Sequence, residues 1–134
     1  MNWEELKILK DEGHLIGAHG QSHQRLSLMD PEQARKEIIE SGEMLDKVLS
    51  QRTEWYAYAY GDIDSIDKNS IQLIFNSFKY CRSGIRGENY PGSNNLFAQQ
   101  IDLEHSWVYQ RMVLEGGLNH RYTSQRQKIK YFED

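Results

Sequence analysis

Short apolar or aromatic stretches alternate along the chain with amphipathic ones, and this alternation restricts the folds that the chain can adopt. The predicted strands are residues 14–19, 53–60, 80–85 and 96–103, and the predicted helices are residues 3–12, 31–50, 71–78 and 125–132. Helices and strands in turn along a chain indicate a parallel sheet, because parallel neighbours need long crossover connections. We therefore expect an α/β fold, either part of a barrel or an open sheet.

The clearest helix signal begins at Asp30. Asp30 can act as the N-cap, Pro31 suits the first turn, and Gln33 can close a capping box. A stripe of small and apolar residues then recurs at helical spacing, formed by Ala34, Ile38, Gly42, Leu45 and Leu49. This stripe predicts a long helix that buries one face.

The length and composition fit one globular domain and exclude several functions. The chain has 134 residues and a formal net charge of −4 without a long basic run, so nucleic acid is not an expected partner. No stretch reaches the length of a membrane span, and the first residues are charged, unlike a signal peptide. Cys81 is the one cysteine, which excludes an intrachain disulfide. The sequence as given predicts a cytoplasmic protein, provided that Met1 is its natural start.

Polar and aromatic residues follow the predicted strands, where parallel α/β folds place their chemistry. His19 ends one strand and is followed by His23. Tyr60 and Gly61 end the next strand, and Arg82 lies near the end of a third. Neutral imidazoles bind zinc and similar ions well, and two histidines at this spacing can approach one ion from a tight loop. The spacing alone leaves a second interpretation open, in which both are surface or capping histidines.

The residues around this pair resemble the polysaccharide deacetylase family, the metal-dependent de-N-acetylases of chitin, peptidoglycan and related glycans. In that family a Gly-His-Glu-Ile-Gly-like strand leads to two histidines, and a Leu-Ser-like turn and a long helix follow. This sequence has Gly13-His14-Leu15-Ile16-Gly17, then His19 and His23, then Leu26-Ser27. A second family block, an aromatic-Ala-Tyr-Pro-Tyr-Gly strand end, resembles residues 56–61 (YAYAYG) in order and spacing.

This resemblance, which is close from residue 3 to residue 85, implies a distorted (β/α) barrel and a hydrolase. Residues 1–134 would be a single, partial polysaccharide deacetylase-like domain that lacks the first strand. The implied reaction removes acetyl groups from an amino-sugar-containing polysaccharide. A divalent metal, with zinc expected, polarises the acetamide carbonyl and activates water, while a carboxylate takes a proton and an acid protonates the departing amine. A polysaccharide or oligosaccharide is then the expected substrate.

The same resemblance implies a metal site and a substrate surface. His19 and His23 would be the two histidine ligands of the metal. Tyr58, Tyr60 and Gly61 would line the substrate wall, where a backbone amide beside the aromatic residue helps to hold the oxyanion.

Two further residues receive catalytic roles from the resemblance. Arg82 would orient a catalytic carboxylate or bind an acidic sugar, and an exposed arginine with a surface partner is the alternative. His120, in Leu118-Asn119-His120, matches a Leu-X-His element that supplies the general acid. The alternative for His120 is a histidine in a surface loop.

The sequence also departs from the family pattern. The Thr-Phe-Asp-Asp-like strand end that supplies the third ligand and the general base normally precedes this region, and the chain has no residues there. Gly20 replaces the usual Ser or Thr, and Ala59 replaces the usual Pro. Asp62 and Asp64 are the nearest carboxylates in the sequence, although a solvated turn with Asp64 capping the next helix is the alternative interpretation. Loss of the general base lowers rates on the order of 10²–10⁴-fold, so we expect an impaired enzyme.

Two other interpretations stay open. In one, the chain is a non-catalytic remnant of this fold that binds a glycan or a partner chain through the aromatic strand end. In the other, it is an unrelated α/β domain whose histidine pair is incidental. A missing first strand would also leave a barrel edge exposed, which favours self-association.

Overall fold

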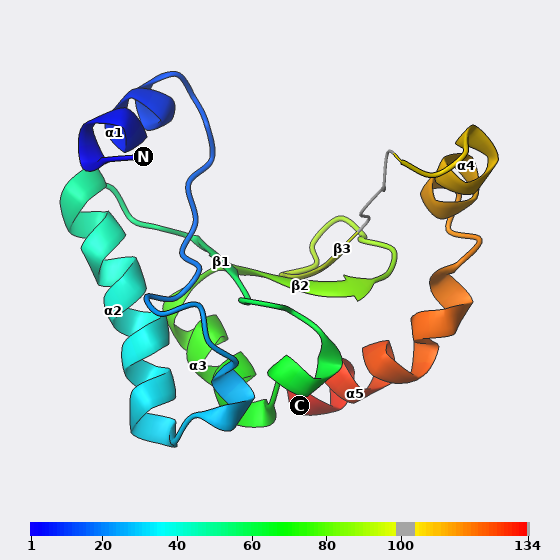
Figure 1. Ribbon diagram of the computed structural model, residues 1–134. Helices are drawn as coiled ribbons and strands as arrows, with labels where there is room; N and C mark the ends of the chain where they lie inside the picture. The colour runs from blue at the N-terminus through cyan, green and yellow to red at the C-terminus, as the bar shows by residue number, and fades with distance from the viewer. Residues whose placement is uncertain (99–103, 134) are drawn as a thin grey trace.

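The computed structural model describes residues 1–98 and 104–133, and its centre is a small parallel sheet (Figure 1). The strands lie in the order β1 (Trp55–Ala57), β2 (Tyr80–Arg86) and β3 (Asn95–Ala98), and both neighbouring pairs are parallel. The α-helices are α1 (Trp3–Asp11), α2 (Pro31–Leu49), α3 (Lys68–Ser77), α4 (Trp107–Leu114) and α5 (Thr123–Glu133). Short 3₁₀ turns are η1 (Leu26–Leu28), η2 (Ile63–Ser65) and η3 (Asn119–Tyr122).

The α/β class with a parallel sheet is confirmed, but the first predicted strand needs a correction. Residues 14–19 meet the sheet only through an isolated parallel bridge at Ala18. The Ala18 amide donates to the Trp55 carbonyl at 2.8 Å, and the Ala57 amide donates to the Ala18 carbonyl at 2.9 Å. Leu15 is 68% exposed, so the start of this segment is not a buried strand. The described strands form an open sheet, and the assignment of this sheet to part of a distorted (β/α) barrel stays a prediction.

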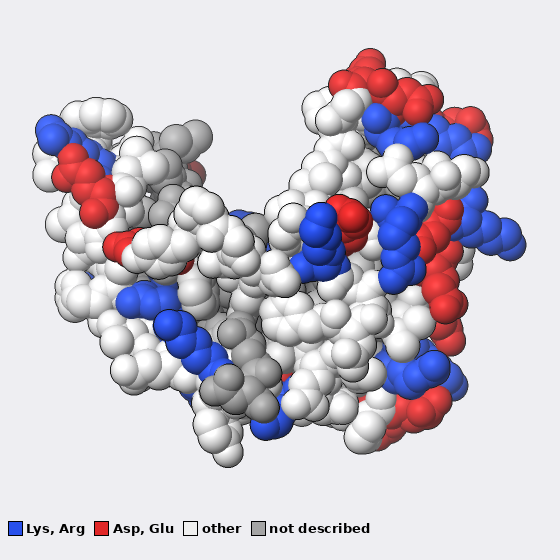
Figure 2. Space-filling view, turned by 180° about the vertical axis from the view of Figure 1, so that it is seen from behind, with Lys and Arg blue, Asp and Glu red and all other residues white. Residues whose placement is uncertain are grey.

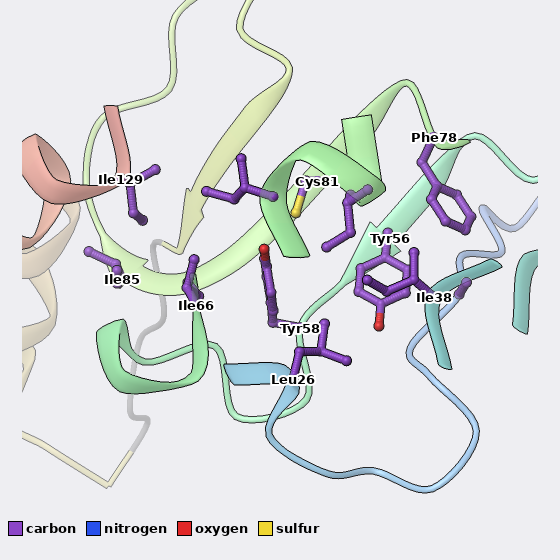
Figure 3. Packing of buried hydrophobic residues seen from close by; sticks show 12 residues of the cluster. Leu26, Ile38, Tyr56, Tyr58, Ile66, Phe78, Cys81, Ile85 and Ile129 are labelled. Carbon is purple, nitrogen blue, oxygen red and sulfur yellow. The ribbon is translucent and has the colours of Figure 1, made fainter. Parts of the chain in front are cut away.

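The hydrophobic core lies on one face of the sheet, which α2, α3 and α5 cover (Figures 1 and 3). Side chains alternate along β2, so Cys81, Ser83 and Ile85 are buried on this face. Ile38 of α2 and Ile129 of α5 are completely buried within the same cluster. The sheet and three helices therefore share a single core.

Helix α2 confirms the strongest sequence prediction. Asp30 is its N-cap and accepts hydrogen bonds from the amides of Glu32 and Gln33, each at 3.0 Å, without the predicted capping box. Of the predicted stripe, Leu45 is half-buried and the others are buried: Ala34, Ile38, Gly42 and Leu49. The packing of this stripe fixes the rotation of α2 about its axis.

The opposite face of the sheet has no layer of helices over it within the described residues. Tyr80, Arg82 and Gly84 alternate with the buried residues of β2 and are exposed or half-buried on this face. In Figure 1 the helices α1 and α4 rise on either side of the sheet, and Figure 2 shows the hollow between these two arms from behind. The carboxyl end of β1 is therefore accessible from the open face.

The C-terminal part contains elements that the sequence analysis missed. Helix α4 and the turn η3 lie in a stretch for which we predicted no helix or strand, whereas the predicted terminal helix is confirmed as α5. The strand predicted over residues 96–103 is confirmed at its start as β3, and residues 99–103 lie outside the described residues. No helix in the described ranges is long and apolar enough to cross a membrane.

Asp46 fixes the C-terminal end of α2 against the start of β1. Its Oδ1 accepts a hydrogen bond from the Thr53 amide at 2.6 Å, and its Oδ2 accepts one from Arg52 at 3.0 Å. Partial burial acts to raise the pKa of the Asp46 carboxyl group, but the hydrogen bonds from Thr53 and Arg52 outweigh it and hold the pKa below its ordinary value. The carboxylate therefore stabilises the fold at neutral pH, and this contribution is lost as the pH falls through the folded-state pKa.

We expect Asp46→Ala to lower the free energy of unfolding by about 1–3 kcal/mol at neutral pH, because the Thr53 amide loses its acceptor. Urea unfolding near neutral pH and again at about pH 2 measures the change, and Glu43→Ala, an exposed acid on the same helix, is the control. The difference between wild type and variant should shrink at low pH, as the wild-type carboxylate takes up a proton. An equal difference at both pH values, or an equal loss in the control, would contradict this role.

Candidate active site

His19 follows the bridge at Ala18 and is tied to the sheet through its ring. Its Nδ1 lies 2.9 Å from the carbonyl oxygen of Ala57, the last residue of β1. A carbonyl oxygen can only accept, so Nδ1 carries the proton and donates it. In the neutral ring the nitrogen without a proton is then Nε2. Histidines that bind metals usually donate their other ring nitrogen in this way.

His23 lies beside His19, and the separation of the two rings suits one metal ion. The ring centroids are 5.1 Å apart in an edge-to-face arrangement. A zinc ion at about 2.1 Å from an imidazole nitrogen lies about 3 Å from the ring centre, so two rings at this separation can bind one ion at a nearly tetrahedral angle. Within residues 1–98 and 104–133, no group of three or more His, Cys, Asp or Glu side chains comes together. The two imidazoles therefore fit two positions of a metal site.

The residues between the two histidines form a tight loop that α2 holds. The amides of Gln21 and Ser22 both donate to Oε2 of Glu37, at 2.7 and 3.1 Å. Partial burial acts to raise the pKa of the Glu37 carboxyl group, but hydrogen bonds from Ser22 and Gln21 hold it below its ordinary value. Glu37 is therefore ionised at neutral pH.

Gly20 gives the Glu37 carboxylate room to reach this loop. Its φ is +79°, a left-handed conformation that favours glycine. A Cβ at Gly20 would lie 2.9 Å from Oε2 of Glu37, the oxygen that accepts both amide hydrogen bonds. The structure therefore explains why glycine stands where the resemblance led us to expect Ser or Thr.

Tyr60 and Arg25 extend the site beyond the histidine pair. The centroids of the His23 and Tyr60 rings are 5.2 Å apart, and the guanidinium carbon of Arg25 lies 4.7 Å from the centroid of the Tyr60 ring. Nη1 of Arg25 donates to Oδ1 of Asp62 at 2.8 Å and to Oγ of Ser65 at 2.7 Å. Arg25 thus links the Tyr60 ring to the turn η2.

A left-handed turn places Tyr60 beside the histidines. Tyr60 and Gly61 both have φ of +69°, which is uncommon for tyrosine. A Cβ at Gly61 would lie 2.5 Å from the amide nitrogen of Gly84, so glycine is required there. Tyr60 is 55% exposed. The Gly61 amide donates to the Ala59 carbonyl at 2.9 Å, whereas the Tyr60 amide has no acceptor in the described part of the chain.

Tyr58 does not lie where the sequence analysis placed it. Its side chain is 5% exposed and points into the core, with its hydroxyl 3.2 Å from Oγ of Ser70 (Figure 3). Burial raises the pKa of its phenol well above the ordinary value. Tyr56 and Tyr58 alternate with Ala57, so both point towards the helices. Tyr58 is a core residue and does not line a substrate surface.

Arg82 and His120 differ in their relation to the histidine pair. Arg82 is exposed on β2 in register with Ala57, whose carbonyl binds His19, and its role in the site stays a prediction. His120 lies in η3 between α4 and α5, on the other side of the molecule from the histidine loop (Figure 1). Its Nδ1 lies 3.1 Å from the Gly117 carbonyl. The structure does not bring His120 to the pair, because a local turn holds its ring against its own backbone.

Asp62 and Asp64 belong to a turn and are not part of a metal cluster. Oδ1 of Asp62 accepts hydrogen bonds from the amides of Asp64 and Ser65, each at 3.1 Å, and so caps η2. Partial burial acts to raise the pKa of the Asp62 carboxyl group, but Arg25 and Ser65 outweigh it and hold the pKa below its ordinary value. The N-cap of α3 is Asp67, which corrects the expectation for Asp64.

The sequence analysis missed three groups that shape this site, namely Arg25, Glu37 and the carbonyl of Ala57. The hydrogen bonds of Glu37 join it to residues up to 16 positions away in the sequence. Arg25 and Asp62 are 37 positions apart, and His19 and Ala57 are 38 positions apart. Contacts of this kind depend on how distant elements pack. The one available signal was the charge of Arg25 two residues after His23.

Comparisons with known proteins point to one family. The family model for polysaccharide deacetylase matches residues 1–74. A peptidoglycan deacetylase from Helicobacter pylori is 27% identical over 88 residues, which are 66% of this chain and 29% of the relative.

Solved structures show a similar fold. The Streptococcus pyogenes deacetylase PplD, solved in complex with acetate, has a TM-score of 0.64 at 23% identity over 72% of this chain and 43% of its own. A polysaccharide deacetylase from Bacillus cereus has a TM-score of 0.60 at 17% identity over 72% of this chain and 31% of its own. The allantoinase Puue has a TM-score of 0.56 at 16% identity over 93% of this chain and 46% of its own. The chain therefore spans less than half the length of each of these proteins.

We expect Gly20→Ala to destabilise the protein by about 1 kcal/mol more than Gly13→Ala does. Both glycines have positive φ, so both variants incur the left-handed penalty of about 1–2 kcal/mol. A Cβ at Gly13 has no neighbour within 4 Å, whereas at Gly20 it would push the Glu37 carboxylate away from the loop amides. Urea unfolding of both variants measures the difference, and equal losses would show that Glu37 does not depend on the space at Gly20.

Proposed function

Since the chain belongs to the polysaccharide deacetylase family, we propose that its site hydrolyses the acetyl group of an amino sugar within a polysaccharide. The observation that carries this proposal is the arrangement of the two histidines. The His19 ring is fixed by the Ala57 carbonyl so that Nε2 is left without a proton, and the His23 ring lies 5.1 Å away. The family is generally metal-dependent, and these residues fit two positions around an ion.

His19 and His23 would hold a divalent metal, and zinc is the ion that two neutral imidazoles at a tetrahedral angle suit best. A bound ion of this kind supplies a Lewis acid that polarises a carbonyl and lowers the pKa of water. The hydrogen bond from His19 to Ala57 keeps the proton on Nδ1 and prevents the ring from rotating. Nε2 of His19 is therefore without a proton and held in a fixed orientation before any ion binds.

The turn at Tyr60 supplies the proposed contacts to the substrate. Its amide, which has no acceptor in the described chain, can donate to the oxygen on which negative charge develops as the acetamide carbon becomes tetrahedral. Its exposed ring offers a flat apolar surface to a sugar, and Arg25 holds that ring in place. Gly61 allows this turn to lie against Gly84 of β2.

The groups that transfer protons are incomplete among the described residues, and we propose that this chain alone is an impaired catalyst. No carboxylate joins the two histidines there, and His120 faces its own turn. A missing general base lowers the rate on the order of 10²–10⁴-fold. The third ligand and the base would then come from residues other than those the structure describes.

The proposed substrate class is an N-acetylated cell-wall glycan, because one relative is a peptidoglycan deacetylase. A non-catalytic glycan-binding function is the second candidate. The exposed Tyr60 ring favours it, since the ring can contact a sugar whether or not the metal site is complete. Both functions use the same surface and differ in whether acetate is released.

We expect the wild-type chain to bind one equivalent of Zn²⁺ or Co²⁺, and His19→Ala or His23→Ala to weaken that binding by more than about 100-fold, because each removes a ligand. Isothermal titration calorimetry measures the affinity. The matched control is His14→Ala, which removes an exposed histidine that lies 3.9 Å from Glu12. Equal heats in the wild type and in the His19 and His23 variants would exclude the metal site.

Release of acetate from an acetylated chitooligosaccharide separates the two candidate functions. Slow release that both histidine variants abolish supports an impaired deacetylase. Binding of the oligosaccharide without release supports the glycan-binding function. Release at the same rate in the wild type and in both variants would overturn the proposed reaction.

A further inference from the structure

The carboxylate of Glu37 joins helix α2 to the loop between the two histidines. One oxygen, Oε2, accepts from the amides of Gln21 and Ser22, at 2.7 and 3.1 Å. Successive amides that point to one oxygen form a concave anion-binding arrangement in the backbone. The anion that occupies it here is part of the protein itself. Glu37 lies within α2, which is held to the core by Ile38, the next residue in the chain.

The same loop is held at two further points. His19 donates to the Ala57 carbonyl at its start. The side chain of Gln21 donates to the carbonyl of Lys36 at 3.4 Å and to Oε2 of Glu40 at 3.3 Å. The hydrogen bonds that Gln21 makes within the described residues all run to α2, and together with the contact of His19 they fix the loop between a strand on one side and a helix on the other.

His23 depends on this arrangement more than His19 does. Its φ is +53°, a left-handed conformation that costs a non-glycine residue about 1–2 kcal/mol. A residue in such a conformation persists when its surroundings fix it. The Ser22 amide, one residue before His23, donates to Glu37. The carboxylate thus fixes the backbone that leads directly into His23 and sets where its ring lies.

Other roles for Glu37 do not account for these contacts. Glu37 lies in the second turn of α2, beyond the N-cap contacts that Asp30 makes with Glu32 and Gln33. No ion pair between Glu37 and a cationic side chain is present among the described residues. Its hydrogen bonds all run to the loop.

We propose that Glu37 is a positioning residue, whose carboxylate holds the loop at residues 20–22 so that the rings of His19 and His23 stay together at the spacing a metal ion needs. This inference rests on the proposed function, because the ion is the ligand that the spacing serves. Glu37 acts through the backbone of Gln21 and Ser22 and does not itself bind the ion.

The test compares Glu37→Gln and Glu37→Ala with the wild type, using Co²⁺ alone as the probe in calorimetry. Outer contacts of metal ligands typically contribute 10–100-fold to affinity, so Glu37→Ala should bind Co²⁺ about 10–100-fold more weakly. Glu37→Gln should fall between the two, since its amide oxygen can still accept from Gln21 and Ser22 without the charge. Glu43→Gln removes the same charge from an exposed position on the same helix, so this control variant should bind Co²⁺ as tightly as the wild type does.

A metal-free measurement distinguishes failure of this inference from failure of the proposed function. In the apo protein, amide exchange at Gln21 and Ser22 should be at least about 10-fold faster in Glu37→Ala than in the wild type and faster by a smaller factor in Glu37→Gln, and the cross-relaxation between the ring protons of His19 and His23 should weaken in the same order. If the wild type does not bind Co²⁺ but these effects are present, the metal function fails and the loop role of Glu37 stands. Wild-type affinity and unchanged ring contacts in Glu37→Ala would overturn the inference. If Glu37→Ala does not fold, the same outcomes are read from Glu37→Gln.

Discussion

The hydrogen bond from Nδ1 of His19 to the Ala57 carbonyl is the contact on which the site depends. It joins the histidine loop to the carboxyl end of β1, and it selects the tautomer whose Nε2 has no proton. β1 itself is short, but it pairs with β2 on one side and with the bridge at Ala18 on the other. The strand is thus fixed at both edges, and the ring that it orients has a defined place relative to the sheet.

The rest of the site surrounds that fixed ring from two directions. Helix α2 reaches the loop through Glu37, and the turn after β1 brings Tyr60 to within 5.2 Å of the His23 ring, measured between centroids. Arg25 then ties Tyr60 to η2 through Asp62. The side chains that make these contacts are exposed or half-buried, so the site depends on the core for rigidity. That core lies against the face of the sheet that α2, α3 and α5 cover.

Local sequence patterns predicted much of this arrangement. The parallel sheet, the cap and the buried stripe of α2, and the position of the histidines after an extended segment all followed from periodicity and capping residues. The alternation of side chains between the two faces of the sheet, which holds for Tyr56 and Tyr58, does not continue to Tyr60. Strand periodicity would place Tyr60 on the core face with Tyr56 and Tyr58, but the left-handed turn at Tyr60 and Gly61 reverses the chain and exposes its ring. The alternating pattern of a strand does not indicate at which residue the strand ends.

Other features could not be predicted because they arise from packing between distant segments. The contacts of Glu37 and Arg25 each join residues that only the folded sheet and helices bring together. The segment at residues 14–19 has the apolar sequence of a strand, yet hydrogen bonds to the sheet form only at Ala18. Family resemblance supplied the identity of the proposed ligands, whereas the tautomer and the loop geometry came from the structure alone.

The most direct test of this account is X-ray absorption at the zinc edge of the chain loaded with one equivalent of Zn²⁺. Two histidines that share one ion predict two imidazole nitrogens at about 2.0–2.1 Å, with the characteristic outer scattering of both rings. The same measurement on His23→Ala should show one imidazole. A wild-type spectrum with one imidazole or none, or a spectrum that His23→Ala does not change, would contradict the paired site.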